Sequence, residues 1–171
     1  MYGIKEFDNY IFLPGSTINS IFLVMIKKAE VENYQEIQLV WESSVKTTHH
    51  FLPDDYFQEI RSMFQTFLPA VDLYIDHDDS GKITGFLGVA DGKIEMLFLH
   101  PNNISAGIGR SFTRFAIDQL QVTKVDVNEQ NENAIEFYQR MGFTVVKRNE
   151  TDGLGRPFPI LEMVLGTGSN V

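Results

Sequence analysis

The residues best suited to chemistry are two glycines, Gly107 and Gly109, which stand where a strand gives way to a helix. The strand is predicted over Lys93–Leu99, and apolar residues then recur with helical spacing from Ile108 to Leu120. A glycine-rich turn that opens a helix presents free backbone N–H groups and the positive end of the helix dipole. Such a turn suits a bound phosphate group, although a helix cap without any ligand produces the same short pattern.

A dinucleotide-binding fingerprint is a second interpretation of this turn. It requires a third glycine at the position of Phe112, and a first glycine almost directly after the strand. Residues 100–106 separate Leu99 from Gly107 instead. A dinucleotide-dependent oxidoreductase is therefore the less favoured interpretation, even though Asp126 lies at a suitable distance to bind a ribose.

A second motif follows the predicted helix. Lys124–Val127 reads as a short strand, and Asn131 is a good N-cap for a helix that Gly142 ends. Phe143–Val146 begins another strand. The predicted order is strand, phosphate-type turn, helix, strand, helix, strand.

Together the two motifs resemble those of the GNAT N-acetyltransferases. Residues 131–143 read NENAIEFYQRMGF and match the family signature Asn-x-x-Ala-x-x-Phe/Leu-Tyr-x-x-x-Gly-Phe in full. Residues 104–109 read ISAGIG, so Ile104 replaces the Gln or Arg that opens the family's first signature. The resemblance runs from about Met25 to Leu165. The runs VNEQN at 127–131 and DGLGRPFP at 152–159 look most like small bacterial peptidyl-lysine acetyltransferases.

The resemblance implies a mixed α/β fold. Its central, mostly antiparallel and twisted sheet would be splayed at the cofactor site and flanked by helices on both faces. It also implies direct transfer of an acetyl group from acetyl-CoA to a primary amine, on a protein lysine, a protein N-terminus or a small molecule. A non-catalytic acyl-CoA-binding sensor or interaction module is the alternative, because Ile104 interrupts the signature.

The resemblance also assigns the cofactor contacts. The pantetheine arm of acetyl-CoA would pair with the backbone of the strand that ends at Leu99, like an added strand. The pyrophosphate would lie on backbone N–H groups of the glycine turn, and Arg110 and Arg114 could add positive charge. The expected cofactor-binding residues are Leu97, Phe98, Leu99, Ile104, Ser105, Ala106, Gly107, Ile108, Gly109, Arg110, Asn131 and Tyr138.

Two side chains are expected to act on protons. Tyr138 stands where the family places its general acid, although its spacing also suits a core residue. Glu95 is the candidate base, because burial within an apolar strand would raise the pKa of a carboxyl group. Strand alternation places Glu95 on the face of Leu97 and Leu99, opposite Ile94. A chain of ordered water as the base, or a solvent-facing Glu95 beside Lys93, are the alternatives.

The acceptor amine would enter from the other side of the sheet, between the first two helices and a late hairpin. Aromatic residues and histidines gather there in the sequence and could wall a primary amine. The expected acceptor-binding residues are Trp41, His49, His50, Phe51 and Phe158.

Composition excludes several other classes of protein. The net charge of −9 argues against a nucleic-acid-binding protein and favours cationic acceptors. The chain has no cysteine, which rules out disulfides and thiolate metal sites and is typical of a cytoplasmic protein. The histidines lack metal-ligand spacing, and no apolar segment is long enough for a membrane span. A homodimer is left open.

The length of 171 residues predicts one domain over residues 21–171. Residues 1–20 would form an extension, either an additional strand at Tyr10–Leu13 or a segment ahead of a natural start at Met25. The remaining predicted elements alternate between strands and amphipathic helices: a strand at Ile21–Lys27, helices at Asn33–Val45 and from Pro53 to Leu68, and antiparallel strands at Val71–Asp76 and Ile83–Ala90.

Overall fold

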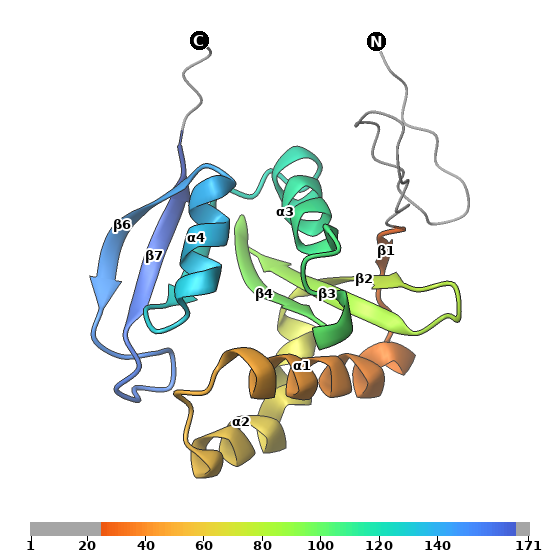
Figure 1. Cartoon of the computed structure of the whole chain (residues 1–171), viewed down its shortest axis with the longest axis horizontal. Helices are drawn as coiled ribbons and strands as arrows, with labels where there is room; N and C mark the ends of the chain where they lie inside the picture. The colour runs from red at the N-terminus through yellow and green to blue at the C-terminus, as the bar shows by residue number, and fades with distance from the viewer. Residues whose placement is uncertain (1–24, 167–171) are drawn as a thin grey trace.

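A single sheet of seven strands forms the centre of the molecule, and helices cover both of its faces (Figure 1). The computed structural model describes residues 25–166. The spatial order of the strands is β1-β2-β3-β4-β5-β7-β6. All neighbouring pairs are antiparallel except β4 and β5, which are parallel. The strands are β1 (Lys27–Lys28), β2 (Asp72–His77), β3 (Ile83–Ala90), β4 (Lys93–Leu99), β5 (Lys124–Asn128), β6 (Phe143–Asn149) and β7 (Ile160–Leu165).

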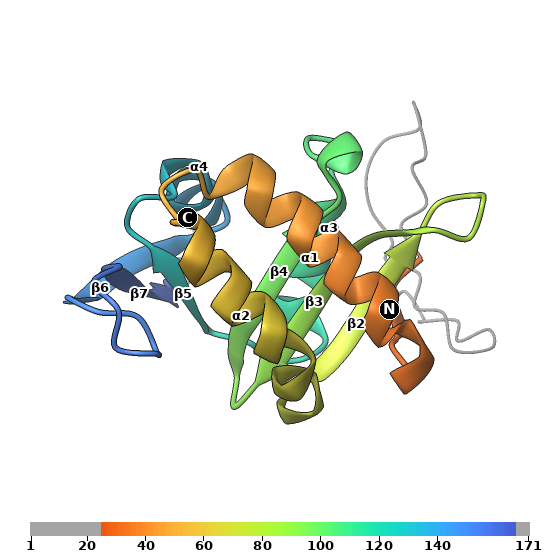
Figure 2. The same ribbon diagram turned by 90° about the horizontal axis from the view of Figure 1, so that it is seen from below.

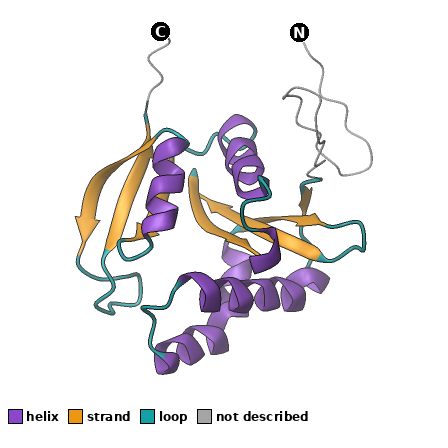
Figure 3. Cartoon of the chain, viewed as in Figure 1, coloured by secondary structure: helices purple, strands orange, loops and turns teal. Residues whose placement is uncertain are grey.

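The helices divide between the two faces, as Figures 2 and 3 show. The first two cover one face with a core that includes Ile37, Phe64 and Phe86. The last two cover the other face with a core that includes Phe112 and Phe115. The α-helices are α1 (Tyr34–Thr48), α2 (Asp54–Phe67), α3 (Ile108–Asp118) and α4 (Glu132–Arg140). The short 3₁₀ helices are η1 (Val31–Asn33), η2 (Leu68–Ala70) and η3 (Pro101–Asn103).

The parallel contact between β4 and β5 is very short. Only Lys93 and Ile94 pair with β5, opposite Lys124 and Val125. From Glu95 to Leu99, the edge of β4 that faces β5 has no strand partner among residues 25–166, although β4 stays paired with β3 on its other edge. We call this region, in which β4 and β5 diverge, the splay. The splayed sheet with helices on both faces confirms the fold that the sequence predicted.

A β-bulge in β4 coincides with the start of the splay. Met96 pairs with Gly88 and Ile94 pairs with Val89, so Glu95 is the extra residue between them. The bulge makes the predicted side-chain alternation wrong. Ile94 packs in the same core as Leu97, while Met96 packs on the opposite face.

The N-terminal end of the described chain is held by a buried carboxylate. The backbone N–H of Met25 donates to Oδ1 of Asp76 (2.9 Å), and the Thr84 hydroxyl donates to Oδ2 of the same residue (2.5 Å). Lys27 and Lys28 pair with β2, so the strand predicted at Ile21–Lys27 overlaps β1 at Lys27, and residues 21–24 of that prediction lie outside the described residues. The expected extension over residues 1–20, including the possible strand at Tyr10–Leu13, lies outside the described residues.

No helix in residues 25–166 combines the length and the apolar character required to cross a membrane. The same residues contain no group of three or more His, Cys, Asp or Glu side chains that could hold a metal ion.

Candidate active site

The glycine turn places several backbone N–H groups at the start of α3. Gly107 and Ser105 have positive φ values of 87° and 72°, which turn the chain sharply before the helix. The first backbone hydrogen bond into α3 runs from Ser111 N–H to the Gly107 carbonyl (3.0 Å). The amides of Ile108 to Arg110 therefore lack helical partners, as expected for a first turn. These free amides at the positive end of the helix dipole suit an anion, and we call them the cradle.

Two amides of the predicted cradle are already engaged. Ile104 N–H donates to the Pro101 carbonyl (3.3 Å), and Ala106 N–H donates to the Asn103 carbonyl (3.2 Å). Both bonds stabilise the turn that follows β4. The cradle is thus narrower than the sequence predicted and centres on Gly107 and the first turn of α3. Ile104 is 42% exposed, and its aliphatic side chain has no hydrogen-bonding group.

The two glycines of the turn have different roles. A Cβ atom on Gly107 would meet no atom within 4 Å, so the space beside it is free for a ligand, whereas its positive φ disfavours any other residue. A Cβ on Gly109 would lie 3.4 Å from Leu99 and 3.7 Å from Phe137. Gly109 therefore lets α3 pack closely against β4 and α4.

Tyr138 lies on α4 with its ring in the core. The residue is only 6% exposed, and its ring makes edge contacts with Phe137 (5.0 Å) and Phe143 (5.6 Å). Burial raises the pKa of the Tyr138 phenol, so the hydroxyl keeps its proton at neutral pH. The expectations of a core residue and of a proton donor are therefore compatible: packing fixes the ring, and the hydroxyl remains a donor.

Asn131 is the N-cap of α4, as predicted. Its Oδ1 accepts a hydrogen bond from the Ala134 N–H (3.2 Å). Because the cap uses the side-chain oxygen, the Nδ2 group is the part of Asn131 that suits a contact with the pantetheine arm.

Glu95 is not buried, which contradicts the sequence prediction. Its side chain is 33% exposed and pairs with Lys93 (3.1 Å), and Lys93 also pairs with Asp126 on β5 (2.8 Å). The bulge turns Glu95 toward solvent at the narrow end of the splay, which matches the alternative that the sequence left open.

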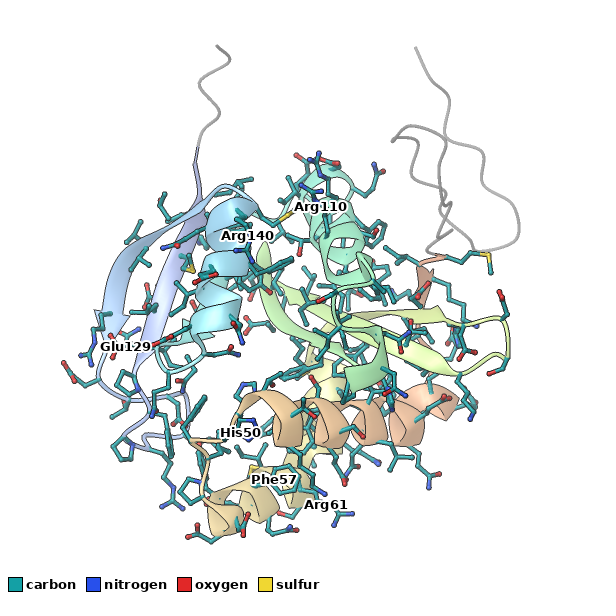
Figure 4. The ribbon with its side chains drawn as sticks, in the orientation of Figure 1. His50, Phe57, Arg61, Arg110, Glu129 and Arg140 are labelled. Carbon is teal, nitrogen blue, oxygen red and sulfur yellow. The ribbon has the colours of Figure 1, made fainter. Side chains whose placement is uncertain are left out.

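Trp41 belongs to the core and not to an acceptor site. It is 4% exposed and stacks between Phe57 (5.3 Å) and Phe64 (4.6 Å) of α2. Its helical spacing in α1 places it on the inner face of the helix. Three of the remaining predicted acceptor residues, His49, His50 and Phe51, follow the end of α1, where Figure 4 labels the exposed His50. The fourth, Phe158, lies in the loop between β6 and β7.

Five rings form a row from β4 to the loop between β6 and β7. The ring centroids are 6.2 Å apart for Phe98 and His49, 5.3 Å for His49 and Phe51, and 6.4 Å for Phe51 and Phe158. Phe158 stacks on Tyr56 of α2 at 5.1 Å. This aromatic row brings together three of the five predicted acceptor residues, His49, Phe51 and Phe158, and His49 joins it to Phe98 in the unpaired part of β4.

The loop that carries Phe158 is fixed by residues that the sequence reasoning missed. Asp152 accepts hydrogen bonds at Oδ1 from the backbone N–H groups of Leu154 and Arg156 (2.9 Å each). Its Oδ2 accepts the hydroxyl proton of Tyr56. The signal for this loop was an Asp followed by two glycines, which is typical of a side-chain-capped turn.

A shallow depression between α1 and α2 is a helix contact and not a second site. Gln38 receives a hydrogen bond from Gln65 (2.7 Å), and Glu42 pairs with Arg61 (2.7 Å). Figure 4 labels Arg61 on α2, away from Arg110 at the start of α3 and from Glu129 and Arg140, which flank α4. The polar groups of the depression thus bond to one another.

Residues 30–163 match the family model described as the acetyltransferase (GNAT) domain, and the chain belongs to this family. It is 32% identical over 141 residues to peptidyl-lysine N-acetyltransferase YjaB of Escherichia coli K12, covering 82% of this chain and 96% of YjaB. It is 26% identical over 124 residues to peptidyl-lysine N-acetyltransferase YiaC of the same organism, covering 71% and 84%.

Solved structures agree with this membership. The solution structure of apo YjaB from Escherichia coli has a TM-score of 0.78 at 31% identity and covers 86% of this chain and 100% of its own. PaiA N-acetyltransferase from Thermoplasma acidophilum, solved in complex with coenzyme A, has a TM-score of 0.62 at 21% identity, covering 81% and 97%, and shares the fold. The chain is an N-acetyltransferase that uses acetyl-CoA.

A glycine substitution tests the cradle. Gly107→Ala is expected to weaken acetyl-CoA binding about tenfold, because alanine resists the φ of 87° and rotates the amides of the cradle. Isothermal titration with acetyl-CoA measures the affinity. Gly81→Ala is the matched control, since Gly81 has a φ of 83° and equally free space but lies in the β2–β3 turn. Equal affinities for the two variants would show that the turn does not bind the cofactor.

The burial of His49 predicts a specific sensitivity to acid. Burial, and to a lesser extent the neighbouring His50, lowers the pKa of His49 to about 4 from an ordinary 6.5. Below pH 6.5 the unfolded chain binds a proton at His49, whereas the folded chain does so only near pH 4. The folded state therefore keeps its full stability above pH 6.5, and a loss of stability develops as the pH falls toward 4. It amounts to about 2 kcal/mol between pH 7 and pH 5.

Urea unfolding at the two pH values measures this loss. Burial also lowers the pKa of His77, so only the difference between the wild type and His49→Asn isolates His49. The variant is expected to lose about 2 kcal/mol less than the wild type. Equal losses would contradict a buried, neutral His49.

Proposed function

We propose that this enzyme acetylates the ε-amine of a lysine side chain in a peptide or protein, by direct transfer from acetyl-CoA. The observation that carries this proposal is the unpaired edge of β4 from Glu95 to Leu99, which lies between the α3 cradle and the aromatic row. Main-chain groups on this edge have no strand partner and suit an extended ligand that adds to the sheet.

The residues around the splay fit acetyl-CoA. The cradle at Gly107 would receive the pyrophosphate, because its amides and the helix dipole favour negative charge. The backbone of Leu97 to Leu99 would bind the pantetheine arm and polarise the thioester carbonyl. Bound there, acetyl-CoA supplies an acyl group activated for attack by an amine. Ile104 offers no side-chain contact, so we expect the backbone to provide most of the affinity.

Two proton transfers accompany the reaction. The amine must lose a proton before it attacks, and the departing sulfur must gain one. Tyr138 would supply the proton to sulfur, since its buried phenol stays protonated at neutral pH. Glu95, at the exposed bulge beside the splay, would accept the proton from the amine, directly or through water.

Two features support a lysine acceptor. Relatives that are 32% identical to this chain are named peptidyl-lysine N-acetyltransferases. The net charge of −9 attracts cationic substrates at long range. A lysine side chain is also narrow and aliphatic up to its amine, which suits passage along the aromatic row.

The acceptor class can be tested directly. The purified enzyme is incubated with acetyl-CoA and either an N-terminally blocked lysine peptide, a peptide with a free N-terminus but no lysine, or spermidine, and products are identified by mass spectrometry. We expect acetylation of the lysine ε-nitrogen at least tenfold faster than of the other two amines. Preferential modification of spermidine or of the N-terminus would refute the lysine assignment. Acetyl-CoA binding without any transfer would instead favour the non-catalytic alternative.

The role of Tyr138 is tested by removing only its hydroxyl. Tyr138→Phe is expected to lower kcat about 100-fold or more and to leave the affinity for acetyl-CoA unchanged, because the ring packing is preserved. Tyr74→Phe is the control, because Tyr74 lies on β2 and its ring packs against Phe115 of α3, with 4.9 Å between the ring centroids. Steady-state kinetics and isothermal titration provide the two measurements. An unchanged kcat in Tyr138→Phe would exclude the tyrosine as the acid.

The setting of the enzyme is part of the proposal. The absence of cysteine supports a cytoplasmic location. Strand β6 lies at one edge of the sheet with Val145 and Val146 exposed, and this edge would be the contact in a homodimer.

A further inference from the structure

His49 is held rigidly beside the unpaired part of β4. It ends α1, where its N–H donates to the Val45 carbonyl (2.8 Å) and its carbonyl accepts the Leu52 N–H (2.9 Å). Its ring lies 6.2 Å from that of Phe98 and 5.3 Å from that of Phe51. Phe98 belongs to the segment of β4 that lacks a partner in the splay. Backbone and ring contacts thus fix the imidazole where an acceptor would approach β4 from the α1–α2 face.

The contacts of Thr48 favour one tautomer of His49. The Thr48 hydroxyl oxygen lies 2.8 Å from the Ser44 carbonyl oxygen and 2.7 Å from Nδ1 of His49. When the hydroxyl donates its only proton to Ser44, its oxygen can act toward Nδ1 only as an acceptor. In this arrangement Nδ1 carries the ring proton, and Nε2, on the opposite edge of the ring, presents a lone pair.

The lone pair on Nε2 is not used within the described part of the chain. No hydrogen bond joins Nε2 to another residue of 25–166. Within those residues, every fully buried polar side-chain atom has a partner, so Nε2 reaches accessible space. The rings that contact His49, Phe51 after α1 and Phe98 of β4, are neutral, and His50 is the titratable group that affects its pKa.

We propose that His49 binds the acceptor: its unprotonated Nε2 accepts a hydrogen bond from the substrate amine and holds the nitrogen against β4 beside Phe98. This inference rests on the proposed function and adds the group that recognises the amine. One N–H of the amine is directed to Nε2, and the rings of Phe51 and Phe98 keep the aliphatic stem in a fixed direction. Orientation of this kind places the nitrogen lone pair for attack.

His49 acts as a hydrogen-bond acceptor and not as the proton-accepting base. Burial keeps the imidazole neutral well below pH 7, and a base that resists protonation cannot retain a proton taken from an ammonium group. Removal of the proton is left to Glu95 or water. His49 is thus a determinant of acceptor binding, and its loss is expected in KM for the amine more than in kcat.

Four proteins test this role with the N-terminally blocked lysine peptide as acceptor: the wild type, His49→Asn, His49→Gln and His77→Asn. Asparagine can keep the contact with Thr48 but places no acceptor at the Nε2 position. Glutamine is longer, and its Oε1 can reach toward that position. His77 ends β2, which β3 separates from β4, and provides the matched control.

We expect His49→Asn to raise KM for the peptide at least tenfold, with the affinity for acetyl-CoA unchanged. His49→Gln should recover part of this loss, and His77→Asn should match the wild type. An unchanged peptide KM in a folded His49→Asn that binds acetyl-CoA would overturn the proposal. A parallel loss of acetyl-CoA affinity would also overturn it, because His49 would then act on the cofactor site.

A measurement without turnover separates this inference from the proposed function. Side-chain ¹⁵N NMR of the wild-type enzyme with CoA bound should show an unprotonated Nε2 for His49 at pH 7. Addition of the peptide should shift this resonance and leave that of His77 in place. A protonated Nε2, or a resonance that no amine shifts, would overturn the assignment. A shift caused by spermidine but not by the lysine peptide would support His49 and refute the lysine acceptor.

Discussion

The site depends on one constraint, the early separation of β4 from β5. A parallel pair that continued past Ile94 and Val125 would use the main-chain groups of both strands in the sheet. The bulge at Glu95 bends β4 at the point where pairing stops, because the extra residue breaks the register with β3. The free edge that results would be a liability in most sheets, since unpaired strand edges attract other chains. Here that edge faces the amides of the α3 cradle and the capped start of α4, so an extended ligand can complete the sheet.

In the proposed site, the two faces of the sheet bind different ligands: the cofactor on one face and the acceptor on the other. On the α3–α4 face, Gly109 allows a close approach of helix and strand, and the cradle at Gly107 faces free space. On the α1–α2 face, the aromatic row approaches the same strand through Phe98. The row ends in a loop that Asp152 fixes by accepting the hydroxyl of Tyr56. Asp152 accepts hydrogen bonds from its own turn and from Tyr56 of α2, and these bonds hold the loop that carries Phe158 in a fixed position beside the proposed acceptor site.

Sequence reasoning predicted the elements that carry strong local signals. Glycines at positive φ, an Asn N-cap and amphipathic helices leave marks in the sequence, so the glycine turn before α3 and the Asn131 cap were predicted correctly. The face of Ile94 was mispredicted, because a bulge at Glu95 leaves no local signature and places Ile94 on the same face as Leu97 and Leu99. Trp41 was assigned to the wrong environment, since an aromatic residue on the inner face of a helix suits a core as well as a site. The contacts of Tyr56 with Asp152 join residues far apart in the chain, which no local pattern reveals.

The net negative charge of the protein acts on the acceptor at long range, whereas the neutral imidazole of His49 would act on it at contact distance. The acidic groups nearest the splay are already partnered: Glu95 and Asp126 share Lys93, and Glu162 pairs with Lys147 (3.0 Å). The excess of negative charge therefore attracts a cationic acceptor mainly through its long-range field. At the strand itself, a carboxylate in contact with the amine would stabilise the ammonium form, which cannot attack a thioester. A neutral imidazole between aromatic rings has the opposite effect, because desolvation lowers the pKa of an amine and the lone pair of Nε2 still offers a hydrogen bond. The same burial that makes His49 a poor base therefore makes its surroundings favourable to the nucleophilic form of the substrate.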